Sequence, residues 1–138
     1  MSTIIADNLT GRASAGTVTV TSEGGSATQS LQQGLTKVWG SFEQDGTHAF
    51  YDSFNLASIA DTGTGTSRFV FTNNMGNANY ATTGCSGEQS GGGNRVMGIK
   101  GNSAVPATTG FDIANFSLAN GSASDDTRLS VSVNGDLA

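Results

Sequence analysis

Charge, cysteine, proline and histidine are all scarce in this sequence. Only 12% of the 138 residues are charged, and the chain holds one cysteine, one proline and one histidine. A single cysteine excludes a disulfide within the chain, and one Cys with one His gives no zinc-type spacing. The six basic residues stand apart and the net charge is −5. These features argue against a nucleic-acid-binding surface.

Long apolar runs are missing as well. No stretch approaches the roughly 20 apolar residues of a membrane-spanning helix. The first residues carry neither the basic region nor the apolar region of a secretory signal. We therefore expect a soluble protein that is not secreted by a cleavable signal and does not insert into membranes.

Small and turn-forming residues take the place of the missing ones. Gly, Ser, Thr and Asn supply 65 of the 138 residues, whereas Leu, Ile, Val and Phe supply only 27. Because Gly, Ser, Thr and Asn are poor helix formers, this composition favours many short strands joined by tight turns. So few large apolar side chains predict a thin core, which favours association with identical copies.

The spacing of β-branched and apolar residues also predicts strands. We expect strands near residues 17–21, 37–39, 48–54, 67–72, 78–83, 95–100, 111–118 and 128–133. Residues 61–66 are expected to form a loop. Short strands separated by frequent turn signals predict an all-β fold, a β-sandwich of jelly-roll-like kind.

One segment has helical spacing instead. Leu31, Leu35 and Val38 recur at intervals of four and three residues, which is typical of one face of a helix. We predict a single short helix at about residues 27–36. Its apolar stripe could pack on its own domain or on copies of itself about a three-fold axis.

The predicted organisation has two parts. Residues 1–25 are expected to form an extended N-terminal arm that anchors the chain. Residues 26–138 are expected to form the β-sandwich domain with its short leading helix.

Five stretches of the chain resemble a known group of proteins. They are residues 21–25, 30–39, 52–55, 71–80 and 133–138. In this order they resemble small virion proteins of tailed bacteriophages, particularly those of marine phages, which are short fibre, spike or capsid-decoration components. The resemblance implies a non-enzymatic structural protein on the surface of the phage particle. It also implies assembly as a homotrimer, attachment to other capsid or tail proteins, and synthesis in the host cytoplasm.

Two sets of residues are candidates for contacts. The candidates for anchoring or for the interface between copies are Ile4, Ile5, Leu9, Leu31, Leu35 and Val38. The alternative function is a tail-fibre module that recognises a host surface glycan through a Gly-rich loop. The candidate ligand-facing residues are Tyr80, Glu88, Gln89 and Asn94.

No catalytic set is predicted. With one histidine and 17 serines, a Ser/His/Asp set around His48 can always be drawn, and no Gly-x-Ser-x-Gly elbow supports it. A strand histidine is the simpler interpretation, and Cys85 is interpreted as an ordinary thiol. An enzyme that degrades host polysaccharide is therefore the disfavoured alternative.

No metal and no cofactor is predicted either. Asp61-x-Gly63-x-Gly65 resembles part of a calcium loop, but the further carboxylates and the closing Glu are missing. A Ca²⁺ site between subunits remains open at this point. Exposed aromatic residues can stack on sugars, but Trp39 is expected to be used for packing because core residues are scarce.

Overall fold

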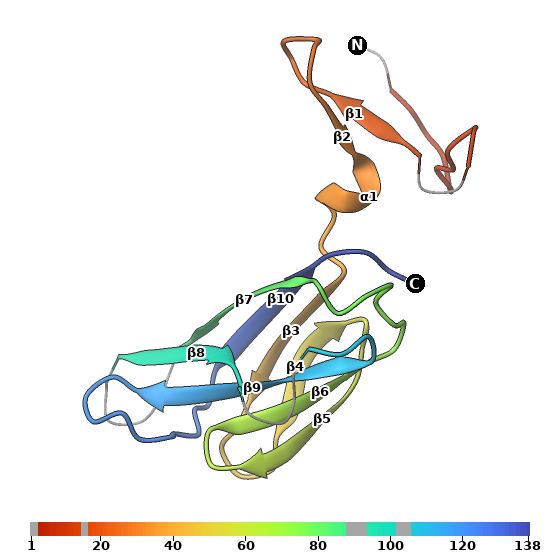
Figure 1. Cartoon of the computed structure of the whole chain (residues 1–138). Helices are drawn as coiled ribbons and strands as arrows, with labels where there is room; N and C mark the ends of the chain where they lie inside the picture. Colours follow the sequence, from red (N-terminus) through yellow and green to blue (C-terminus); the bar gives the residue numbers. More distant parts are fainter. Residues whose placement is uncertain (1–2, 15–16, 88–93, 102–105) are drawn as a thin grey trace. The chain divides into compact units, whose positions relative to one another are not determined.

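The chain divides into two compact units, Met1–Leu35 and Thr36–Ala138. The computed structural model describes residues 3–14, 17–87, 94–101 and 106–138 (Figure 1). The second unit is a β-sandwich, so the all-β sandwich predicted from composition and alternation is confirmed. The boundary between the units lies after Leu35, whereas the sequence placed the end of the arm at residue 25.

The N-terminal unit holds a small antiparallel sheet. Strand β1 (Thr19–Thr21) pairs with β2 (Thr28–Ser30), and Val20 lies opposite Gln29. A two-stranded ribbon of this kind has one layer and no second sheet to cover either face. The described residues of this unit accordingly include none that is buried.

The helix predicted at residues 27–36 is much shorter than expected. Helix α1 spans only Leu31–Gly34, and the Ser30 hydroxyl caps it by accepting a hydrogen bond from the Gln33 backbone N–H at 3.4 Å. The residues before it, Thr28–Ser30, are paired in β2. Leu35 after it has extended backbone angles. Strand pairing on one side and Gly34 on the other limit the helix to one turn.

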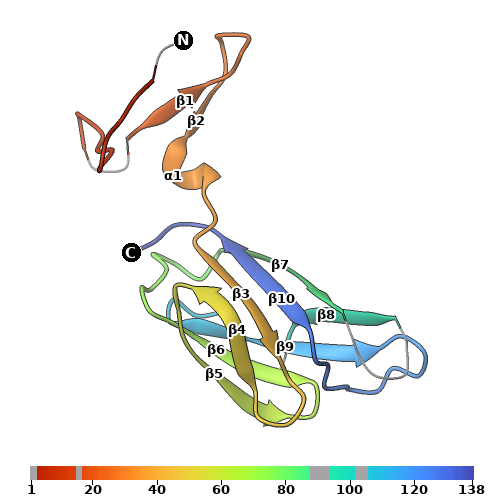
Figure 2. The ribbon, with the colours of Figure 1, turned by 180° about the vertical axis from the view of Figure 1, so that it is seen from behind.

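The sandwich consists of two four-stranded antiparallel sheets, stacked on each other in Figure 2. The first sheet has the order β4-β3-β10-β7, from Ala49–Phe54, Val38–Glu43, Leu129–Asn134 and Ala81–Ser86. The second has the order β5-β6-β9-β8, from Leu56–Gly63, Thr66–Phe71, Gly110–Ser117 and Arg95–Ile99. The loop predicted at 61–66 is wrong in extent, since only Thr64 and Gly65 separate β5 from β6.

A single residue, Asn55, carries the chain from the first sheet to the second. It has a positive φ of 59°, which asparagine tolerates better than most side chains. Its amide nitrogen donates to the carbonyl oxygens of Lys37 and Asn73, both at 3.2 Å, and its amide oxygen accepts from the Asn73 N–H at 2.7 Å. The side chain therefore holds the corner that the backbone turns.

The core lies between the two sheets and follows from the alternation within the strands. In β3, Val38 and Phe42 point inward, and in β10, Leu129, Val131 and Val133 do so. Aromatic rings continue the core across the second sheet. Their centroid distances are 5.0 Å for Phe42–Phe69, 5.1 Å for Phe69–Phe111 and 5.7 Å for Phe71–Phe111.

Candidate functional site

Most of the predicted anchoring residues are exposed on the N-terminal unit. Ile4 is 86% exposed and Ile5 94%, and Leu9 and Leu35 are exposed as well. Leu31 is half-buried and lines a shallow depression of this unit together with Leu9 and Leu35. All five predicted anchoring side chains of this unit therefore meet solvent at least in part.

Val38 does not belong to this set. It is fully buried in the sandwich core, where it lies opposite Val133 of β10. Assigning Val38 to an interface between copies was wrong, because its place in the strand alternation of β3 turns it inward. The helical spacing that linked it to Leu31 and Leu35 ends with α1 at Gly34.

Tyr80, one of the predicted ligand-facing residues, packs within the sandwich. The ring of Tyr80 packs against Phe71 and Phe111, and its hydroxyl donates to the carbonyl oxygens of Ala107 at 3.0 Å and Gly110 at 2.9 Å. Burial raises the pKa of Tyr80 to about 12, and the hydrogen bond to Ala107 opposes this rise. Tyr80 therefore acts in packing.

Of the other three ligand-facing candidates, only Asn94 belongs to the described residues. Asn94 is exposed just before β8, and its carbonyl oxygen accepts a hydrogen bond from the Leu118 N–H at 2.9 Å. Glu88 and Gln89 lie outside the described residues.

His48 does sit in a Ser/His/Asp arrangement, but one that no substrate can reach. Its Nδ1 atom lies 3.0 Å from the Ser67 hydroxyl, and its Nε2 atom lies 3.7 Å from the Asp61 carboxylate. Ser67 is 0% exposed, and its hydroxyl also accepts a hydrogen bond from Gln44 Nε2 at 2.9 Å. A catalytic serine must reach a substrate carbonyl, and the buried Ser67 hydroxyl does not. The hydrogen bonds of Ser67 with His48 and Gln44 instead join β6 to the segment between β3 and β4.

A second buried polar cluster surrounds Asp126. Arg95 Nε donates to one carboxylate oxygen at 3.1 Å, while Asn115 Nδ2 at 3.0 Å and the Ser86 hydroxyl donate to the other. Burial pushes the pKa of Asp126 upward, but the three hydrogen bonds and the charge of Arg95 outweigh it and hold the pKa below its ordinary value. The cluster joins β7, β8 and β9 to the approach to β10.

Asp61, the carboxylate of the calcium-like stretch, is engaged within the chain, as is Asp125. Asp61 accepts the Gly63 N–H at 2.7 Å and Asp125 accepts the Gly65 N–H at 2.6 Å, so both serve the β5–β6 turn. Among the described residues, no group of three or more His, Cys, Asp or Glu side chains could hold a metal ion. In the same part of the chain, no helix has the length and apolarity needed to cross a bilayer.

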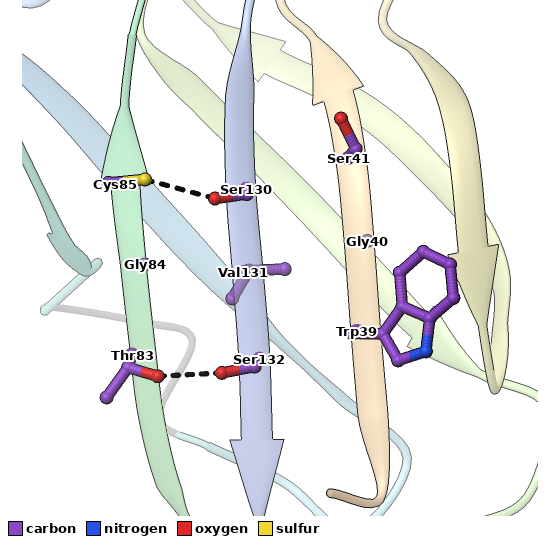
Figure 3. A pocket seen from close by; sticks show the side chains of 9 residues that line it. All are labelled: Trp39, Gly40, Ser41, Thr83, Gly84, Cys85, Ser130, Val131 and Ser132. Carbon is purple, nitrogen blue, oxygen red and sulfur yellow. Dashed lines mark hydrogen bonds between the residues drawn. The ribbon is translucent and has the colours of Figure 1, made fainter.

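The outer face of the first sheet is the main feature that sequence reasoning missed. Trp39, expected inside, is 39% exposed on this face. It borders a shallow depression with eight further lining residues, Gly40, Ser41, Thr83, Gly84, Cys85, Ser130, Val131 and Ser132 (Figure 3). A signal was available, because inward-facing Val38 and Phe42 require the odd positions of β3 to point outward.

Comparison of the chain with protein-family models, with curated proteins and with solved structures finds no match.

Proposed function

We propose that this chain is a non-enzymatic structural protein on the surface of a bacteriophage particle, as a short fibre, spike or capsid decoration, and that it assembles as a homotrimer. In this proposal the N-terminal unit provides attachment and the sandwich faces solvent. The observation that carries it is the absence of any buried residue among the described residues of Met1–Leu35.

The apolar side chains of the N-terminal unit support attachment. Isoleucine and leucine side chains left in water forgo about 1.5–3 kcal/mol each relative to full burial. Ile4, Ile5 and Leu9 gain this stabilisation only when another surface covers them. Packing against copies of the same unit and against neighbouring virion proteins would provide that cover.

The sandwich supports the solvent-facing role. It closes a core of ten buried apolar residues within one chain, so it does not need its copies to complete that core. Its one histidine contacts a fully buried serine. These features fit a domain whose role is structural.

Deletion of residues 1–35 tests this proposal. Thr36–Ala138 is expected to fold, to lose the trimer in light scattering and to lose co-sedimentation with particles of the encoding phage. A truncated chain that still forms trimers and still decorates particles would refute the attachment role.

A matched pair of variants tests whether attachment depends on the apolar residues of the N-terminal unit or on exposed apolar residues in general. Replacing Ile4, Ile5 and Leu9 together by serine is expected to release the chain from particles. The control replaces three exposed apolar residues of the sandwich by serine, namely Val70, Val96 and Leu118. Equal release by both triple variants would remove the support for the N-terminal anchor.

A further inference from the structure

The outer face of sheet β4-β3-β10-β7 presents side chains in two rows that run across the strands. In one row Phe54 lies opposite Trp39, Trp39 opposite Ser132, and Ser132 opposite Thr83. The row spans four strands, or about 14 Å at the usual strand spacing. It begins with two exposed aromatic residues and ends with two hydroxyls.

The second row is polar throughout. It consists of Asp52, Ser41, Ser130 and Cys85, which are register partners in that order. Thus β4 contributes the flat apolar ring of Phe54 and the Asp52 carboxylate at one end of the face, and the other three strands offer hydroxyl and thiol groups next to Trp39.

Hydrogen bonds between neighbouring strands fix the polar groups in place. The hydroxyls of Thr83 and Ser132 lie 2.7 Å apart, and the Cys85 thiol lies 3.1 Å from the Ser130 hydroxyl (Figure 3). A hydroxyl has one donor and two acceptor sites, so each keeps capacity for a ligand after this pairing. Because the paired side chains are already restricted, they lose less conformational entropy when a ligand binds.

We propose that this face is a binding site for a neutral glycan. A sugar ring has a face of C–H groups and an edge of hydroxyls. The C–H face fits the exposed indole of Trp39, whose π-system attracts partly positive hydrogens. The next rings along the glycan lie over Ser132 and Thr83 and exchange hydrogen bonds with them.

The charges around the face favour a neutral ligand. None of the nine residues that line the depression carries a formal charge. At its margin stand two carboxylates, Glu43 and Asp52, and one guanidinium, Arg128, which covers the ring of Tyr51 at 4.6 Å. An anionic glycan would meet a net negative margin on a chain of net charge −5.

A second copy of the chain is a poorer fit for this surface. The cores of protein interfaces are rich in aromatic residues and poor in serine. Here Trp39 and Phe54 are the large apolar side chains. In an interface with a second copy, the polar groups next to them would lose their water without the stabilisation that burial of apolar surface provides. A glycan replaces that water with hydroxyls of its own.

Tryptophan fluorescence of the full chain provides a direct test, because Trp39 is the only tryptophan. The probes are dextran, mannan and galactan as neutral glycans and polygalacturonate as an anionic one. We expect at least one neutral glycan to change the Trp39 emission in a saturable way, and polygalacturonate to leave it unchanged.

Variants then assign the binding to the face, with affinity measured by calorimetry or affinity electrophoresis. Trp39→Ala is expected to weaken binding at least about tenfold, as for other aromatic anchors. Ser132→Ala is expected to weaken it a few-fold. The matched control is Phe116→Ala on the outer face of the second sheet, where Phe116 is also 39% exposed. This control is expected to bind as the unchanged chain does.

Three results would overturn the site. The first is that no neutral glycan perturbs Trp39 or binds the full chain, a result that does not depend on any variant being folded. The second is binding that Phe116→Ala weakens as much as Trp39→Ala does. The third is concentration-dependent dimerisation that Trp39→Ala abolishes, without any glycan binding. The site stands apart from the attachment role of residues 1–35, so particle binding and glycan binding can fail separately.

Discussion

The two units of this chain use the same kinds of residues, but only one of them encloses a core. In the N-terminal unit, alternation produces β1, yet Val20 faces Gln29 and remains exposed. In the sandwich, Val38 and Phe42 of β3 face Val133 and Leu129 of β10. The comparison teaches that alternation makes a strand, whereas an apolar partner strand and a second layer make a core.

The largest expected effect is in the sandwich core. Phe69 is fully buried and lies within 6.0 Å, centroid to centroid, of Phe42, Phe50 and Phe111. Phe69→Ala should lower the free energy of unfolding by about 3–5 kcal/mol, because it leaves a cavity among these rings. Urea unfolding of the full chain measures the loss.

A phenylalanine on the surface of the same domain is the control for this change. Phe54→Ala removes an exposed ring from β4 and should cost less than half as much. Equal losses for the two variants would show that the aromatic cluster is not the main source of stability.

The Asp126 cluster should come next in size. Asp126→Ala leaves the Arg95 guanidinium buried without its carboxylate and should cost about 3 kcal/mol in unfolding free energy. The effect concerns the sandwich alone, because Arg95, Ser86 and Asn115 all belong to it.

The same cluster predicts a loss of stability in acid. Since the folded-state pKa of Asp126 lies below the ordinary 3.8, its contribution is present above about pH 4 and disappears as the pH falls through the lower, folded-state pKa. Unfolding by urea at a series of acidic pH values should show this loss, and Asp126→Asn should reduce it.

Tyr80 should give a smaller effect in alkali. Its pKa is about 12 in the folded chain, against 10.0 when exposed. The unfolded chain therefore releases this proton first, so stability is complete below pH 10.0 and falls between pH 10.0 and about 12. The loss should reach at most about 2 kcal/mol, since Tyr80 is only partly buried.

Phenolate absorbance checks the assignment of this titration. One tyrosine of the native chain should ionise with an apparent pKa of about 12, and Tyr80→Phe should remove that step. A native chain in which both tyrosines titrate at 10.0 would contradict the packing described for Tyr80.

The smallest effect is expected from removing the N-terminal unit. Every residue of the sandwich core lies within 36–138, so deletion of residues 1–35 should change its unfolding free energy by less than about 0.5 kcal/mol. Ile5→Ala in the full chain should change it as little. A shift comparable to that of Phe69→Ala would show that the two units share one cooperative core.

The strands were the most predictable part of the fold. Segments such as 67–72, 95–100 and 128–133 are rich in β-branched and apolar residues, and each forms a strand within a residue or two of these bounds. The helix was predicted less well, because the apolar spacing of Leu31, Leu35 and Val38 is compatible both with one longer helix and with a one-turn helix between two strands. Pairing of Thr28–Ser30 with β1 decided between them.

The candidate sites divide in the same way. The exposure of Ile4, Ile5 and Leu9 was foreseeable, because residues 1–25 were predicted to form an extended arm. The outward position of Trp39 was not foreseen, because scarcity of apolar residues suggested that every aromatic would be needed inside. The sandwich fills its core with phenylalanines instead and leaves its only tryptophan at the surface.

The all-β fold and the apolar and β-branched character of the strands could be predicted from the amino-acid sequence, because strand periodicity is a local property of the chain. The pairing of the strands, the corner that Asn55 turns between the sheets, and the burial of Ser67 and Asp126 among polar partners could not be predicted in this way. Those outcomes depend on contacts between residues far apart in the chain. A buried serine or aspartate is tolerated only where distant partners satisfy it.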